Sequence, residues 1–267
     1  MQKIKFWPHL RVRLDRQIEF QKLMRKKNEE YTGPSGVLLV DKAPDMTSHD
    51  VVAIARRALN TKKIGHCGTL DPMATGLLML VIGRATKIQD LLMSEDKVYE
   101  GTLTLGERTS TQDRQGDVLE TREVGDYSET DVKAAFEAFT GEFEQLPPMV
   151  SAIKMGGVPL YKMARKGIEV ERKLRPVRVT GFDVKRVELP EVDFRVDCSK
   201  GFYVRTYAND IGEKLGCGAH LSELRRTNSG KFTLDRSVTV AQLKEADPEV
   251  LMKSLISLAE ISLMRGA

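Results

Sequence analysis

Gly65-His-Cys-Gly-Thr-Leu-Asp-Pro-Met-Ala-Thr-Gly76 is followed at once by the apolar run Leu77-Leu-Met-Leu-Val-Ile82. The apolar run predicts a buried strand, and the segment before it predicts a loop whose glycines let a ligand approach the backbone closely. Asp71 precedes Pro72, which favours an extended backbone at Asp71, so that the carboxylate projects from the loop. From these residues alone, a turn and an active-site loop are equally good interpretations.

The segments around this loop alternate between strands and helices. Residues 36–40 predict a strand, and Thr47-Ser48 with Asp50 predicts a capped helix that ends near Leu59, with a loop over residues 60–76 behind it. In residues 98–105 the character of the side chains alternates, which predicts a strand at a sheet face. A second capped helix is predicted from Ser128 to Gly141.

The second half of the chain continues this mixture. Strands are predicted at 177–189 and 192–198, a helix at about 206–215, and a helical pattern from Val238 to Leu258. The chain lacks a regular strand–helix–strand alternation, so the predicted fold class is α+β rather than a doubly wound parallel sheet.

Length and composition narrow the class of protein. The 267 residues allow one large domain or two small ones. The longest apolar run, Leu77–Ile82, is far shorter than the roughly 18 residues of a membrane span, so we expect no membrane association. Three cysteines without a CxxC pair, and a basic N-terminus without an apolar leader core, favour a location in the reducing cytoplasm.

The charge is distributed unevenly. The formal net charge is +4, and the excess lies in residues 1–32, which hold nine Lys and Arg against four Asp and Glu. This basic N-terminal arm ends at the breaker Gly33-Pro-Ser-Gly36. A solvated tail and an arm that contacts RNA both fit this pattern.

The sequence lacks the common motifs for cofactors and metals. It contains neither a glycine-rich dinucleotide loop nor a phosphate loop, and Cys217-Gly-Ala-His220 has no second ligand pair for zinc. Cys67 follows His66, but adjacent side chains rarely share a face, which disfavours a thiol nucleophile. We therefore expect chemistry without a cofactor or a metal.

A long irregular segment, residues 145–175, is rich in cations. Residues 161–178 hold seven Lys and Arg against two Glu, with Lys154 nearby. This composition suits a loop that grips a phosphate backbone, although a solvated charged face is the default interpretation. Further along, Tyr203 and Arg205 share a face if the chain is still extended there.

Several ordered blocks resemble the bacterial tRNA pseudouridine synthase B (TruB) family over about residues 36–232. They are Gly36–Lys42, Gly65–Gly76, Lys97–Gly101, Leu105–Asp113 with Gly116, Gln145–Lys154, Tyr161 with Ala164–Gly167, Cys198–Thr206 and Leu215–Gly230. The resemblance implies a pseudouridine synthase fold, with a mixed, largely antiparallel sheet flanked by helices and an inserted thumb loop at about 145–175. It also implies that uridine 55 in the T arm of tRNA is isomerised to pseudouridine without a cofactor.

The resemblance implies three catalytic residues. Asp71 falls on the catalytic aspartate, which acts on the ribose or on the base, and both routes stay open. Arg205 falls on an active-site arginine whose charge would keep Asp71 ionised. Tyr99 falls on the tyrosine that stacks on the uracil.

Further positions would hold the RNA. His66, Tyr203 and Leu224 fall on positions that line the pocket of the flipped nucleotide, which has lost its stacking partners. Lys154 and Arg165 lie in the thumb loop and are expected to contact the substrate.

The sequence also departs from the family pattern. Cys67 stands in place of a usual Thr, and Ser110 in place of a usual Asp. The expected domains are the arm 1–32, a catalytic domain 33–232 and a short helical tail 233–267, which is too short for the PUA-type RNA-binding domain that bacterial members usually carry.

Two other functions stay open. An RNA-binding protein that only captures an extruded base would not need Asp71, Tyr99 and Arg205 together. A guide-RNA-dependent catalytic subunit would rely on a PUA-type domain. We expect a monomer that acts on tRNA.

Overall fold

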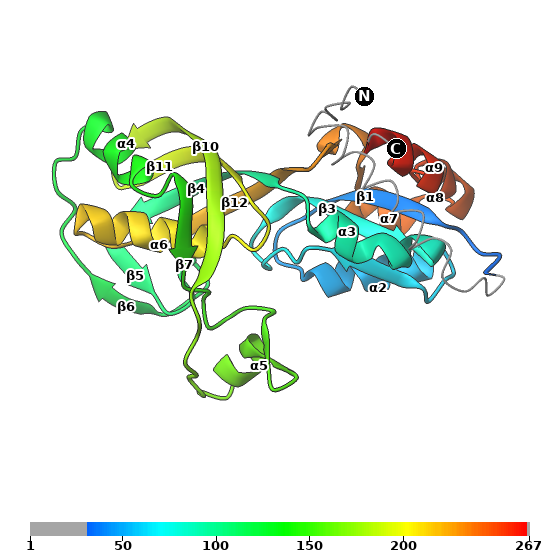
Figure 1. The fold of residues 1–267 in the computed structure, drawn as a ribbon, viewed down its shortest axis with the longest axis horizontal. Helices are drawn as coiled ribbons and strands as arrows, with labels where there is room; N and C mark the ends of the chain where they lie inside the picture. The colour runs from blue at the N-terminus through cyan, green and yellow to red at the C-terminus, as the bar shows by residue number, and fades with distance from the viewer. Residues whose placement is uncertain (1–30, 266–267) are drawn as a thin grey trace, which may run out of the picture. The chain divides into compact units, whose positions relative to one another are not determined.

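The computed structural model describes residues 31–265, which form two compact units. Unit 1 holds the described residues up to Pro72, Gly76–Ser94 and the residues from Lys231 onward, and unit 2 holds Met73–Thr75 and Glu95–Gly230. Both units mix helices with largely antiparallel strands, which confirms the predicted α+β class (Figure 1). Most of the basic arm lies outside the described residues.

Unit 1 is built around one strand that is buried at all of its residues except the first. Its strands are β1 (Gly36–Lys42), β2 (Ile64–Cys67), β3 (Thr75–Ile82), β13 (Phe232–Thr233) and β14 (Val238–Thr239). Strand β3 lies between β1 and β2, because Val81 pairs with Val37 on one side and with Gly65 on the other, both antiparallel. The predicted buried strand is therefore confirmed, whereas the predicted loop 60–76 contains β2, which is too short to show a sequence period.

The helices of unit 1 follow local sequence signals. They are α2 (Ser48–Ala58), the 3-10 helix η1 (Gly83–Ile88), α3 (Gln89–Met93), the 3-10 helix η2 (Leu234–Arg236), α7 (Val240–Glu245), α8 (Pro248–Lys253) and α9 (Leu258–Met264). Thr47 caps α2 and exchanges hydrogen bonds with Asp50, as predicted. Such a box satisfies amide groups that the first helical turn leaves without partners.

The C-terminal segment is part of the core of unit 1. Strand β14 pairs in parallel with β1, and Ile256 forms an isolated bridge with Val37. The predicted helix from Val238 to Leu258 is thus wrong at its start, where Val238 and Thr239 form β14. A strand of two residues is too short to show a period of its own in the sequence. From residue 238 onward five apolar side chains are buried, namely Val240, Leu243, Leu251, Ile256 and Ile261.

Unit 2 has a five-stranded antiparallel sheet in the order β12-β4-β11-β10-β7. These strands are β4 (Lys97–Leu105), β7 (Gly141–Gln145), β10 (Arg175–Glu188), β11 (Glu191–Cys198) and β12 (Ala219–Ser229). The helices are α4 (Glu129–Glu137) and α6 (Val204–Leu215), and a hairpin pairs β5 (Glu107–Thr109) with β6 (Val118–Thr121). Aromatic rings from α4, α6 and the sheet pack together, including Phe136, Phe194 and Tyr207.

The thumb segment leaves this sheet between β7 and β10 (Figure 1). It contains the small hairpin β8 (Lys154–Met155) and β9 (Val158–Pro159), followed by α5 (Leu160–Ala164). Arg172 donates a hydrogen bond to the carbonyl of Pro147 (2.9 Å), which ties the two ends of the segment together. None of the helices in the described part of the chain is long and apolar enough to cross a bilayer.

Candidate active site

The loop that carries Asp71 is fixed on both sides of this residue. On one side, the hydroxyl of Ser48 accepts a hydrogen bond from the Leu70 amide (2.9 Å) and donates one to the Leu70 carbonyl (3.2 Å). On the other side, Lys42 Nζ donates to the Pro72 carbonyl (3.0 Å). Asp71 is half-buried between these anchors. The backbone around the carboxylate is therefore held before any substrate binds.

Lys42 is a site residue that the sequence analysis did not single out. Its side chain is 1% exposed, and Nζ also donates to the carbonyls of Ala43 (2.9 Å) and Met46 (2.7 Å). Burial lowers the pKa of Lys42 to about 8, and the negative charges of Asp71 and Asp45 oppose that shift. At neutral pH the group is thus a cation that links β1 to the candidate loop.

His66 and Cys67 point to different environments on β2. The His66 ring packs edge-on against His49, with centroids 5.3 Å apart, and the His66 carbonyl accepts a hydrogen bond from Gln89 Nε2 (3.1 Å). Cys67 is 1% exposed and belongs to the apolar core of unit 1. A structural role for the thiol fits this position better than nucleophilic chemistry.

Arg205 lies in the first turn of α6 and is 3% exposed. Its guanidinium donates to the carbonyls of Thr111 (2.8 Å) and Val150 (2.7 Å), and Nε lies 3.6 Å from Asp113 Oδ2. The guanidinium is thus oriented from three directions. Its predicted pairing with Asp71, which belongs to the other unit, stays a prediction.

Tyr203 is the N-cap residue of α6 and is half-buried. The Gln145 side chain accepts a hydrogen bond from the Tyr203 amide (2.8 Å) and donates one to its carbonyl (3.1 Å). Because the helix begins at Val204, Tyr203 and Arg205 do not share the face of an extended strand, and that conditional expectation does not apply. Helix formation at Val204 instead points the Arg205 side chain into the protein.

Tyr99 and Leu224 lie on the neighbouring strands β4 and β12. Tyr99 is 9% exposed and stands opposite Arg226 across the pair, and Leu224 stands opposite Gly101. The Leu224 carbonyl accepts a hydrogen bond from Thr75 Oγ1 (3.4 Å). Both side chains are therefore held by sheet structure rather than by a mobile loop.

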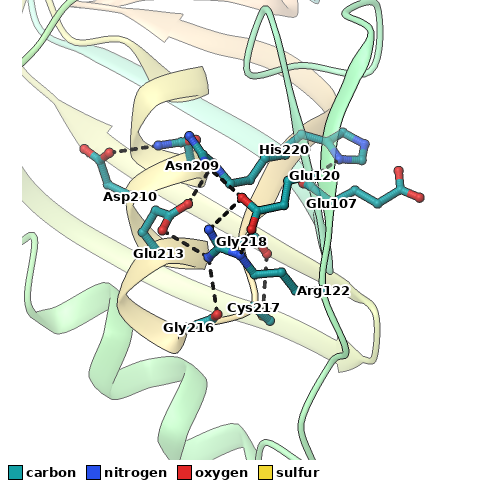
Figure 2. Close-up of polar contacts among 11 residues, drawn as sticks. Glu107, Glu120, Arg122, Asn209, Asp210, Glu213, Gly216, Cys217, Gly218 and His220 are labelled. Atoms are coloured by element: carbon teal, nitrogen blue, oxygen red, sulfur yellow. Dashed lines mark hydrogen bonds and ion pairs between the residues drawn. The ribbon is translucent and has the colours of Figure 1, made fainter.

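An ion-pair network joins the β5–β6 hairpin to the C-terminal half of α6 (Figure 2). Arg122 forms two hydrogen bonds of 2.8 Å to the Glu120 carboxylate and a 3.1 Å ion pair with Glu213 on α6. Arg108 contacts the same two carboxylates, at 3.1 and 2.8 Å. The turn of this hairpin carries Thr111, whose carbonyl accepts a hydrogen bond from the Arg205 guanidinium. By holding the hairpin against α6, the network therefore also holds this acceptor in place.

The thumb residues lie at the surface. Lys154 is exposed on β8, and the exposed Arg165 guanidinium lies 5.6 Å from the centroid of the Tyr161 ring. Of the residues predicted for the site, Asp71 and His66 belong to unit 1 and the other six to unit 2. In residues 31–265 we find no cluster of three or more His, Cys, Asp or Glu side chains suited to a metal ion.

Comparison with known families identifies the chain. The sequence model described as "TruB family pseudouridylate synthase (N terminal domain)" matches residues 56–204, and that of the "tRNA pseudouridylate synthase B C-terminal domain" matches residues 205–260. This chain belongs to the TruB family. The family resemblance of the sequence blocks is thereby confirmed, and the C-terminal match extends it beyond residue 232.

Two bacterial relatives of this TruB chain carry the name tRNA pseudouridine synthase B. The protein from Opitutus terrae is 55% identical over 221 residues, which cover 83% of this chain and 92% of the relative. The protein from Syntrophotalea carbinolica is 48% identical over 228 residues, which cover 85% of this chain and 74% of the relative.

Solved structures of pseudouridine synthases share the TruB fold. A chain of a Cbf5-Nop10-Gar1 complex is 30% identical, with a TM-score of 0.66 over 90% of this chain and 68% of that one. A chain of an H/ACA ribonucleoprotein bound to a substrate RNA is 28% identical, with a TM-score of 0.64 over 91% of this chain and 65% of that one. These similarities confirm the predicted pseudouridine synthase fold.

Proposed function

We propose that this chain isomerises uridine 55 in the T arm of tRNA to pseudouridine, as a monomer in the cytoplasm. Membership of the TruB family and relatives at about half identity that are named tRNA pseudouridine synthase B support the activity and the substrate class. The T arm, the position, the monomeric state and the compartment are parts of the proposal that follow from the family resemblance.

The observation that carries the proposal is the doubly anchored loop at Asp71. Ser48 holds Leu70 and Lys42 holds Pro72, so the carboxylate is presented from a fixed backbone. A fixed catalytic group lowers the entropy that must be lost on reaching the transition state. In the reaction the N1–C1′ bond breaks, the uracil turns and a C5–C1′ bond forms, while a proton leaves C5 and N1 gains one. Substrate and product are isomers, so no other reactant is needed.

Arg205, Tyr99 and the pocket residues have supporting roles in this proposal. A buried guanidinium beside a carboxylate favours its ionised form, which suits Arg205 as the partner of Asp71. Tyr99 offers an aromatic face to a base that has been turned out of its stack, and extrusion costs a few kcal/mol. His66, Tyr203 and Leu224 would line the pocket, and Lys154 and Arg165 would contact the RNA backbone.

The test is direct mapping of the product. Purified protein is incubated with unmodified tRNA transcripts, without guide RNA, and pseudouridine is mapped at single-nucleotide resolution. We expect one modified position, uridine 55, and none in a transcript with cytidine there. Modification at a different position would contradict the assigned target, and no pseudouridine in any transcript would contradict the proposed activity.

A further inference from the structure

Four exposed cations surround the start of β2, and we name them the β2 cation surface: Arg57, Lys62, Lys63 and Arg84. Between residues 51 and 89 the sequence contains six Lys and Arg but one acidic residue, Asp71. None of the ion pairs formed within residues 31–265 involves a member of this surface.

The backbone beneath this surface is fixed. Helix α2 ends in a left-handed residue, Asn60 (φ 44°), whose amide bonds to the Arg57 carbonyl, while the Thr61 amide bonds to the Arg56 carbonyl. This pattern is the Schellman motif, which closes a helix with a defined turn. The Gly83 amide then bonds to the Lys63 carbonyl (2.8 Å) and brings Arg84 beside the turn. The four charges are therefore presented together by ordered backbone.

Several other arginines of the structure have acidic partners. Exposed or half-exposed arginines in ion pairs with Asp or Glu include Arg108, Arg122, Arg178, Arg186, Arg195 and Arg236. Like-charged groups without such partners repel one another in the free protein, and a polyanion removes this repulsion on binding.

Helix-end electrostatics account for only part of the surface. Cations in the last turn of a helix are favoured by its dipole, and Arg57 lies in that turn of α2. Arg56, in the same turn, already donates to the Ile64 carbonyl (3.0 Å) and is therefore not included. Lys62, Lys63 and Arg84 lie outside α2, so the dipole gives no reason for their clustering.

The chemistry of the surface fits a phosphate backbone. Between residues 31 and 96 only one large apolar side chain, Met93, is exposed, so the surface lacks the cluster of apolar anchors of a protein interface or a membrane-inserting face. Strand β2 spans about 13 Å for its four residues, and the surface lies at one end of it with the Asp71 loop after the other. An RNA whose base reaches Asp71 brings phosphates to within this range of unit 1.

We propose that the β2 cation surface binds the phosphate backbone of the RNA substrate, as a second contact area separate from the thumb. This proposal rests on the proposed function for its choice of RNA. The contact positions the RNA without reading its sequence, because phosphate contacts carry no base information.

The test compares two variants with the same loss of charge. The surface variant carries Arg57→Gln, Lys62→Gln, Lys63→Gln and Arg84→Gln. The control variant carries four changes to Gln at exposed lysines elsewhere, namely Lys214, Lys231, Lys244 and Lys253. The dissociation constant of a tRNA transcript is measured at several salt concentrations, and thermal unfolding shows whether each variant is folded.

We expect the surface variant to bind more weakly and with a flatter dependence of log K on log salt. Each lost phosphate contact removes about 0.7–0.9 from the magnitude of the slope, so the whole surface accounts for up to about 3. The control variant should keep the wild-type slope. Equal slopes in all three proteins, or equal losses in both variants, would overturn the proposal. If the fourfold variant does not fold, two double variants replace it: Lys62→Gln with Lys63→Gln, and Arg57→Gln with Arg84→Gln. Each double variant should show about half of the reduction in slope expected for the fourfold variant.

Pseudouridine mapping on the same preparations separates this proposal from the proposed function. If the wild type forms no pseudouridine but its salt slope is steeper than that of the surface variant, the proposed function is contradicted and the surface remains an RNA contact. Wild-type protein that forms pseudouridine while all slopes agree would contradict only the surface.

Discussion

At the scale of single residues, the candidate site combines a half-buried carboxylate with a buried residue that supports it. Asp71 supplies the carboxylate, and the buried Lys42 holds the backbone next to it through the Pro72 carbonyl. The two residues contribute differently, because one change should remove turnover and the other should remove stability.

Asp71→Asn should keep tRNA binding and abolish pseudouridine formation, because the amide has the same shape but is a far weaker nucleophile and base. The dissociation constant and the single-turnover rate are measured side by side. Asp126→Asn, at an exposed acid of unit 2, is the matched control and should behave like the wild type. Substantial turnover by Asp71→Asn would remove this residue from the catalytic role.

Lys42→Met should destabilise the protein in a manner that depends on pH. Loss of the ammonium removes three hydrogen bonds from a charged donor to the carbonyls of Ala43, Met46 and Pro72, and such bonds contribute about 1.5–3 kcal/mol each. The pKa of Lys42 is about 8 when folded and 10.5 ordinarily, so the unfolded chain binds more protons between these values. The stability of the wild type relative to Lys42→Met should therefore rise from about pH 8 to 10.5. Urea unfolding at several pH values measures this, and a constant difference would refute the assigned pKa.

At the scale of elements, the β5–β6 hairpin is joined to α6 by charges at the surface. Hydrogen bonds from Arg122 and Arg108 lower the pKa of Glu120 to about 2 from an ordinary 4.5. The stabilisation that this carboxylate gives is present above about pH 4.5 and is lost as the pH falls toward 2.

Glu120→Gln should therefore lower the melting temperature slightly at neutral pH and by a vanishing amount near pH 2. Exposed ion pairs contribute little individually, and added salt should shrink the difference further. The comparison is made by thermal unfolding between pH 2 and 7. A difference that does not decline with falling pH would show that the network does not depend on this charge.

The elements that sequence reasoning predicted are those with local signals. The helices behind Thr47 and Ser128 were predictable because each capping box lies within four residues. Strand β12 was missed because bulges at Leu221/Glu223 and Arg226/Asn228 break its two-residue period. Lys42 was missed as a support because its acceptor, the Pro72 carbonyl, lies 30 residues further along the chain. The catalytic candidates came from the family blocks, since the loop residues alone also fit a turn.

At the scale of the whole molecule, unit 1 is assembled from segments at both ends of the described chain. The segment expected to be a short helical tail supplies β14 to the edge of β1 and buries Ile256 beside Val37. Unit 1, and with it the Asp71 loop, therefore depends on residues that lie far from this loop in the sequence.

Ile256→Ala should cost about 2–5 kcal/mol of unfolding free energy, the usual range for truncating a buried Ile. Its side chain is 1% exposed, whereas Leu263 on the neighbouring α9 is 72% exposed. Leu263→Ala is thus the control and should change stability by less than about 0.5 kcal/mol. Urea denaturation of both variants decides the matter, and equal small effects would show that the C-terminal segment is dispensable for unit 1.

The double anchoring of the Asp71 loop also sets a limit for protein engineering. Residues 65–76 look like a self-contained cassette, but Ser48 and Lys42, which hold Leu70 and Pro72, come from outside it. A graft of the loop alone into another scaffold would carry the carboxylate without its restraints. A portable segment must therefore include at least residues 36–82, from the start of β1 to the end of β3, because a shorter segment loses the geometry while keeping every residue of the motif.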